Sequence, residues 1–322
     1  MRLLFFMLSM AWAMVMAGAA GPAFAQKFPQ KPIRLLTSAA GGGTDFAARL
    51  IAQGLATSFG MQVVVDNRPS GLVIGEIVAR AAPDGYTMFL NGSAFWLQPF
   101  LHANMPYDPV KDFSPLIMAT NSPNILVVNA SVPVSSVKEL IAAAKAKPGE
   151  LNYGSSSTGT PTHLGAELFK SMTGVNIVRV SYKGNGPAIN ALISGEIQLM
   201  FANAAAVTVH VKSGRLRALA VASSEPTSLA PGLPTMAAAG LPGYESSSTY
   251  GIFGPARMPR ALVGLLNREM VEVLSKSEVK ERLFRAGMEP VASTPEQLAA
   301  TIKSDMAHMG KVIRDAGIRP EF

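Results

Sequence analysis

The sequence alternates short apolar segments with longer segments of helical periodicity, and this alternation restricts the possible folds more than any other feature. The first unit is predicted to contain strands at residues 33–38, 63–65 and 86–90, with helices at 47–59 and 77–82. The second unit is predicted to contain strands at 125–128, 151–153, 177–182, 197–201 and 216–221, with helices at 136–146, around 164–172 and from Pro187 onward. Such units build parallel sheets whose ligand crevices lie at the carboxyl ends of the strands.

The rest of the chain connects and completes these units. Residues 224–259 are rich in proline, glycine and serine, which is typical of a connecting or functional segment. Thr294 to Gln297 has the form of a capping box, and the helix it opens is predicted to run to Ala316. We therefore predict an α/β fold of two lobes that the chain crosses more than once. Residues 26–124 begin lobe 1, residues 125–247 form lobe 2, and residues 248–322 return to lobe 1.

The N-terminus has the features of a cleaved export signal. Arg2 precedes an apolar run from Leu3 to Ala20, and Ala23 to Ala25 has the small-x-small pattern that signal peptidase reads. A transmembrane helix is the alternative, but glycines and a proline end the run and no basic cluster follows it. We predict that residues 1–25 are a signal peptide and that the mature protein is periplasmic.

The composition excludes several classes of protein. The chain contains no cysteine, which rules out disulfides, thiol catalysis and acylation at a cysteine, so we expect a soluble protein without a lipid anchor. The net charge of +7 comes from scattered residues rather than from basic tracts. This pattern argues against nucleic-acid binding and indicates a mild positive field that favours anions.

Two loops between a predicted strand and a predicted helix are the first candidates for a binding site. They contain Ala40, Gly41, Gly42, Gly43, Thr44 and Asp45 in the first loop and Ser155, Ser156, Ser157, Thr158, Gly159, Thr160 and His163 in the second. Free backbone N–H groups and a helix N-terminus favour an anion in both. A tight connection or a flexible surface loop is the alternative for each, but two such loops in equivalent positions favour a shared cleft.

Polar residues also follow other predicted strands. Each lies at the end of a predicted strand or just after it, where side chains face the crevice of a parallel sheet: Asn91, Ser93, Tyr182 and Asn203. Turn formation explains each of them equally well.

Little in the sequence supports catalysis or a metal site. There is no G-x-S-x-G elbow and no H-E-x-x-H motif, and the four histidines lack metal-ligand spacing. His163 is more plausible as a donor to an anion than as a general base. We expect no enzymatic activity, no cofactor and no metal. A serine hydrolase that uses Ser155 to Ser157 with His163 is a minor alternative.

Several short motifs occur together along the chain. They are Lys31–Arg34, the first glycine loop, Asp66–Pro69, Ala82–Thr87, Tyr107–Phe113, Lys147–Gly149, Val180–Gly184 and Gly214–Leu219. In this order and spacing they resemble the Bug proteins, which are the substrate-binding proteins of tripartite tricarboxylate transporters. The resemblance extends from about Phe28 to Glu321.

The resemblance implies a type II periplasmic-binding-protein fold, in which two facing loops hold a ligand carboxylate through backbone amides and ordered waters. The ligand-binding positions that it implies are Ala40, Gly42, Gly43, Thr44, Asp45, Asn91 and Ser93 in lobe 1 and Ser155, Ser156, Ser157, Gly159, Thr160, His163, Tyr182 and Asn203 in lobe 2. Asp45 is expected to shape its loop, because a carboxylate would repel an anion. We predict a monomeric receptor that delivers a small carboxylate to membrane transporter subunits. A sensor subunit acting on a signalling protein is the alternative.

Three departures from the family pattern affect the expected ligand. Residues 37–40 replace the usual prolines and aromatic residue, which enlarges and softens one wall of the cleft. The glycine- and asparagine-rich stretch is shortened to residues 70–73. Ala202 stands where an aspartate is common, which argues against a ligand with an ammonium group and favours a plain or aromatic carboxylate.

Overall fold

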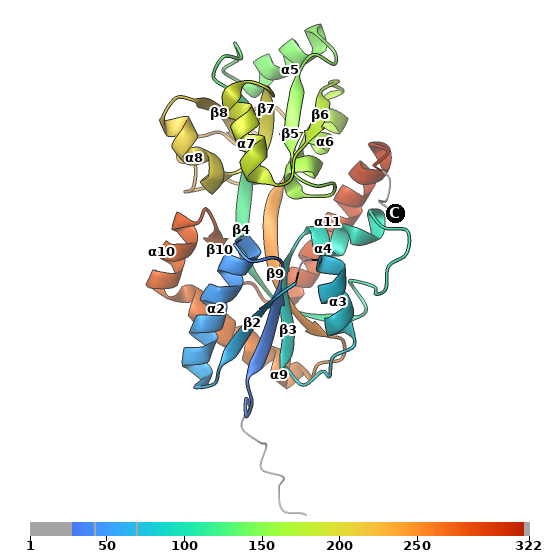
Figure 1. Ribbon diagram of the computed structural model, residues 1–322, viewed down its shortest axis with the longest axis vertical. Coiled ribbons are helices and arrows are strands. Elements are labelled where there is room, and N and C mark those ends of the chain that lie inside the picture. The colour runs from blue at the N-terminus through green and yellow to red at the C-terminus, as the bar shows by residue number, and fades with distance from the viewer. Residues whose placement is uncertain (1–27, 42, 69, 319–322) are drawn as a thin grey trace, which may run out of the picture.

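Two α/β lobes lie one above the other and are joined by a pair of long strands (Figure 1). The structure is a computed structural model that describes residues 28–41, 43–68 and 70–318, so the predicted signal peptide lies outside the described residues. No helix in these ranges is both long enough and apolar enough to cross a membrane.

Lobe 1 is built from both ends of the described chain. It contains β1 (Ile33–Thr37), α2 (Gly43–Phe59), β2 (Val63–Asn67), α3 (Gly71–Ala79), β3 (Thr87–Gly92), α4 (Ala94–Leu97), η1 (Gln98–Phe100), β9 (Ser247–Pro255), α9 (Arg260–Ser275), α10 (Ser277–Arg285), β10 (Glu289–Pro290) and α11 (Pro295–Asp315). Lobe 2 contains α5 (Val137–Ala146), β5 (Asn152–Ser155), α6 (Pro161–Thr173), β6 (Val178–Ser181), α7 (Asn185–Ser194), β7 (Leu199–Asn203), α8 (Ala204–Lys212) and β8 (Leu216–Val221). The strand β4 (Phe113–Asn129) runs through both lobes.

The strand directions determine which ends of the two sheets meet. The sheet order is β2-β1-β3-β9-β4-β7-β5-β6, with β8 and β10 also paired to β4. The first part of β4 pairs antiparallel with β9, and from Asn124 onward β4 pairs antiparallel with β7 and β8. Because β1, β2 and β3 run parallel to one another and opposite to β9, their carboxyl ends point toward lobe 2. By the same reasoning β5, β6 and β7 point their carboxyl ends toward lobe 1.

Apolar side chains fill both faces of the lobe 1 sheet and continue into lobe 2. One cluster, which includes Leu35, Ile51 and Leu266, lies between the sheet and helices α2 and α9. On the opposite face a larger cluster extends from Trp96 in α4 to Phe169 in α6, so the lobes share one continuous core. Burying apolar surface on both faces explains why the central strand β3 contains Met88, Phe89 and Leu90 in succession, all of them buried.

The structure corrects several expected element bounds. Helix α3 spans Gly71–Ala79 rather than residues 77–82, so the shortened 70–73 segment contains its N-cap and its first residues. Helix α7 begins at Asn185, and Pro187 occupies its third position, where a missing N–H costs no helical hydrogen bond. The 224–259 segment, expected to be irregular, contains β9. The lobe boundaries at residues 124 and 247 remain predictions. They fall where β4 changes partners and where β9 begins.

Candidate functional site

The first loop is held in shape by Asp45, whose side chain is almost fully buried. Its carboxylate accepts hydrogen bonds from the backbone N–H of Gly41 (2.9 Å), from Asn67 Nδ2 (2.8 Å) and from Arg49 Nε (3.1 Å). Burial alone would raise the pKa of Asp45, but these hydrogen bonds and the charge of Arg49 hold it below its ordinary value. Asp45 therefore stabilises the loop from within, the role expected for it.

The start of α2 packs closely against Tyr250 of β9 because residue 43 is glycine. A methyl group at Gly43 would lie 2.8 Å from the Tyr250 hydroxyl oxygen and 3.3 Å from Met288 Cε. Gly92, which is opposite Tyr250 in the β3–β9 register, also lies against the ring. A Cβ atom added to Gly92 would lie 3.2 Å from Tyr250 Cε1. A strand that joins the two lobes thus contacts the first loop directly.

We expect Gly43→Ala to lower the free energy of unfolding by about 1–3 kcal/mol, the usual cost of overpacking. In a Tyr250→Phe background the same substitution should cost less, because the oxygen that the methyl group meets is gone. Urea unfolding of the single and double variants measures this coupling. Gly264→Ala in α9 is the control, since nothing lies within 4 Å of an added Cβ there. Equal costs of Gly43→Ala in both backgrounds would contradict the contact.

The second loop is organised by Arg179 of β6. Its Nε donates to Ser155 Oγ (2.8 Å), one terminal nitrogen donates to Thr158 Oγ1 (3.0 Å), and the other donates to the carbonyl oxygen of Ser156 (3.0 Å). Strands β5 and β6 are neighbours in register, with Tyr153 opposite Arg179, which brings the guanidinium to the carboxyl end of β5. The loop therefore has a fixed positive charge directly beside it.

His163 is buried and takes part in the same loop. It is 3% exposed, and its Nδ1 accepts a hydrogen bond from the backbone N–H of Gly159 (3.1 Å). Burial lowers the pKa of His163 to about 4, and the nearby charge of Arg179 adds to the effect. The ring is therefore neutral at pH 7 and carries its proton on Nε2. It is not placed as a base for Ser155 or Ser156, whose hydroxyls bond other groups.

The polar residues at the strand ends fall into two groups. Asn91 and Asn203 lie at the lobe junction, where Asn91 Oδ1 accepts from the Gly92 N–H (2.9 Å) and Asn203 Nδ2 donates to Ser122 of β4. Tyr182 differs, because its hydroxyl donates to Glu196 (2.8 Å), which precedes β7, whereas Asn203 ends that strand. The side chain of Tyr182 therefore lies away from the other expected site residues.

The remaining expected positions show how the loops meet their surroundings. Ala40 and Ser157 are exposed, and Thr44 and Ser38 share a hydrogen bond between their hydroxyls. Gly159 has φ of +78°, and a methyl group there would lie 2.2 Å from Leu101 Cδ1. The second loop, which belongs to lobe 2, is thus in contact with lobe 1. Gly42 lies outside the described residues.

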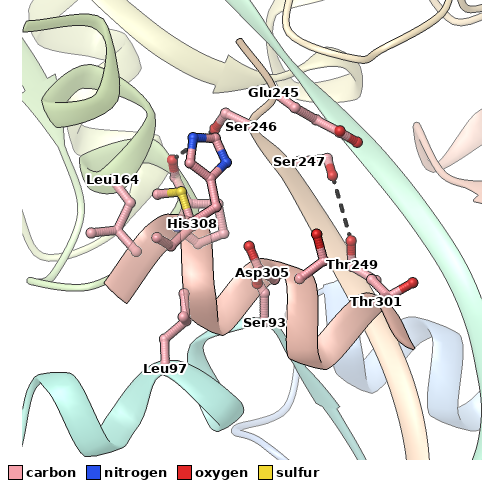
Figure 2. A pocket seen from close by; sticks show the side chains of 13 residues that line it. Ser93, Leu97, Leu164, Glu245, Ser246, Ser247, Thr249, Thr301, Asp305 and His308 are labelled. Carbon is pink, nitrogen blue, oxygen red and sulfur yellow. Dashed lines mark hydrogen bonds between the residues drawn. The ribbon is translucent and has the colours of Figure 1, made fainter. Parts of the chain in front are cut away.

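A cavity of about 260 Å³ opens between the lobes, next to the second loop (Figure 2). It is lined by Ser93, Leu97, Pro161, Leu164, Glu245, Ser246, Ser247, Thr249, Thr301, Ser304, Asp305, His308 and Met309. Ser93 is the expected site residue that lines it, and Pro161 directly follows Thr160 of the second loop. None of the described residues of the first glycine loop contributes to its wall. Within the described ranges no group of three acidic or histidine side chains is arranged to hold a metal ion.

Sequence reasoning missed the residues that support the loops and line the cavity. Arg179 looked like one of many scattered basic residues, although an arginine in a short strand that ends beside a serine-rich loop is a usable signal. Asn67, Tyr250 and Asp305 come from segments distant from the loops in sequence. Only their tertiary contacts reveal them.

Comparison with known proteins places the chain in a defined family. Residues 47–318 match the family model described as TctC, tripartite tricarboxylate transporter family receptor. The chain is 36% identical over 308 residues to protein BugT of Bordetella pertussis, with 94% of each chain covered.

Two solved structures, both described with a bound ligand, have the same fold. Rpa4515 of R. palustris, described with adipate, is 36% identical with a TM-score of 0.79 and 91% and 100% coverage of the two chains. MatC from Rhodopseudomonas palustris, described with bound malate, is 27% identical with a TM-score of 0.75 and 89% and 100% coverage. Together with the two-lobed α/β architecture, these similarities show that the chain belongs to the TctC family of tripartite tricarboxylate transporter receptors.

Proposed function

We propose that this chain is a periplasmic receptor that binds a small organic carboxylate between its lobes and delivers it to the membrane subunits of a tripartite tricarboxylate-type transporter. The proposed role is binding and lobe closure by a monomer, with no chemical conversion of the ligand.

The direction of the strands is the observation that carries this proposal. It brings the carboxyl ends of β1 and β5 to the same junction between the lobes, together with the two candidate binding loops that follow these strands. The charge beside the second loop is the Arg179 guanidinium, and Asp45, the acidic residue of the first loop, has its carboxylate engaged within that loop. Both loops also open a helix, and a helix N-terminus near a positive charge suits a carboxylate guest.

The relatives support the same ligand class. Rpa4515 is described with adipate and MatC with malate, both of which are dicarboxylates. BugD, another similar structure, is described as a periplasmic binding protein. The hydrolase alternative loses support, because His163 Nδ1 is engaged by the Gly159 N–H rather than by a serine hydroxyl.

Thermal unfolding of the protein from residue 26 onward, with and without organic acids, tests the proposal. The panel consists of mono-, di- and tricarboxylates and aromatic acids, each paired with its uncharged amide as a matched control. A ligand at 100 times its dissociation constant should add about 2.7 kcal/mol to the free energy of unfolding. At least one acid should raise the melting temperature while its amide does not. No shift with any acid would contradict carboxylate binding, and unchanged uptake of the bound acid in a deletion strain would contradict the transport role.

A further inference from the structure

The cavity in Figure 2 has a chemical character different from that of the second loop beside it. Thr301, Asp305 and His308 recur at helical spacing on the face of α11 that borders the cavity. Ser246 and Thr249 approach from the strand side, at the end of lobe 2 and in β9. The cavity is therefore walled by both lobes, and a ligand group inside it would contact both.

The wall of the cavity is acidic. Glu245 and Asp305 both line it, and none of the described residues in its wall is a lysine or an arginine. Among the described residues neither carboxylate forms an ion pair with a lysine or an arginine. Burial raises the pKa of Asp305, and the charge of His308, which also lines the cavity, opposes that rise. The wall therefore combines two carboxyl groups with one histidine, and a cationic ligand group would add to its positive charge.

Two polar groups in the wall have unused hydrogen-bonding capacity. Ser93 is 7% exposed, yet its hydroxyl does not cap α4 and bonds no other described residue. Asp305 accepts a hydrogen bond from Trp96 Nε1 (2.6 Å) through one oxygen, and its other oxygen has no donor among the described residues. A ligand that displaces water from these two groups has to replace its hydrogen bonds, so a ligand with several N–H donors is the natural complement.

We propose that this cavity holds the ammonium group at the far end of the receptor's ligand, which makes the preferred ligand an amino carboxylate with the two groups separated by a carbon chain. The inference rests on the proposed carboxylate function, because the carboxylate end would lie at the adjacent second loop. A second carboxylate in the cavity would be repelled by Glu245 and Asp305, whereas an ammonium group gains charge-assisted hydrogen bonds from the same residues.

Ala202 does not oppose this inference. Its side chain is fully buried in the apolar cluster of lobe 2 and does not line the cavity. The missing aspartate at that position therefore does not determine the charge of the space that the far end of the ligand would enter.

Calorimetry with acids matched in length tests the proposal. The set for six carbons is 6-aminohexanoate, adipate and hexanoate, and shorter sets replace these with the four- and five-carbon analogues. At the best length the amino acid should bind about tenfold more tightly than the dicarboxylate. In Asp305→Asn, which keeps an oxygen for Trp96, this preference should disappear while the affinity for the plain acid stays within about twofold. Asp315→Asn, on the same helix but outside the cavity, should behave as the wild type.

Hexylamine separates failure of the subsite from failure of the proposed function. Hexylamine binding that Asp305→Asn abolishes would support the cavity assignment even if no acid bound, and in that case the carboxylate function alone would be contradicted. Tighter binding of the dicarboxylate than of the amino acid at every length would overturn the inference. So would equal effects of Asp305→Asn and Asp315→Asn, or an absence of binding by hexylamine and by every amino acid.

Discussion

Lowering the pH from about 7 to about 4 should reduce the free energy of unfolding by about 3 kcal/mol more in the wild type than in a His163→Asn variant. His163 is 3% exposed, and burial lowers its pKa from 6.5 to about 4. Between these two values the unfolded chain binds a proton at this residue and the folded protein does not. The stability that depends on the neutral ring is therefore complete above pH 6.5 and is lost as the pH falls to about 4.

Urea unfolding of both proteins at a series of pH values measures this difference. Asparagine places an oxygen where it can accept the hydrogen bond from the Gly159 N–H, but it does not titrate. The variant should be less stable than the wild type at pH 7, since it fills the site less well. The two proteins share every other titrating group, so the difference in slope belongs to residue 163. Parallel curves would show that His163 is protonated as easily in the folded protein as in the unfolded chain.

Local periodicity predicted the elements that depend on local signals. Strand β1, helix α5 and helix α11 lie close to their expected bounds, because apolar spacing and end caps are encoded within each segment. The long strand β4 was expected only at 125–128, and its earlier part contains Pro115 and Pro123. Prolines argue against a central strand, but Pro115 lies next to a register shift in the β4–β9 ladder, where a missing N–H is tolerated. The strands β4 and β9, which join the lobes, are stabilised by partners distant in sequence, and a local pattern does not reveal such partners.

The candidate site was predictable to the same extent. The two loops follow buried strands and open helices, so glycine and serine content between two recognisable elements located them. The groups that hold these loops in place are not adjacent to them in sequence. Arg179 reaches the second loop through the pairing of β5 with β6, and Tyr250 reaches the first loop across the β3–β9 ladder. The acidic wall likewise combines Glu245 with Asp305 from a different helix, a juxtaposition that exists only in the fold.

Replacing Arg179 with methionine should weaken the binding of a carboxylate ligand about 100-fold, because three hydrogen bonds of about 1 kcal/mol each hold the second loop in its binding shape. The substitution would leave the hydroxyl of Ser155, which is fully buried, without its donor from β6. It also removes the positive charge nearest the loop, so the affinity of the variant should depend less on salt. Arg179→Lys keeps the charge but cannot bond the same three groups at once. Its affinity for the carboxylate should lie between those of the wild type and of Arg179→Met.

Arg217→Met is the matched control for this experiment. Arg217 is also in lobe 2, where one terminal nitrogen donates to the carbonyl oxygens of Val132 (3.0 Å) and Val134 (2.7 Å), in the segment that leads into α5. Its loss should lower stability by an amount similar to that in Arg179→Met, while carboxylate affinity stays within about twofold, since no binding loop depends on it. Calorimetry gives the affinities and urea unfolding without ligand gives the stabilities. If both variants lost affinity in proportion to their stability, Arg179 would act through the general stability of lobe 2. A loss of affinity confined to Arg179→Met, partly restored by lysine, would show that this residue positions the loop that binds the ligand.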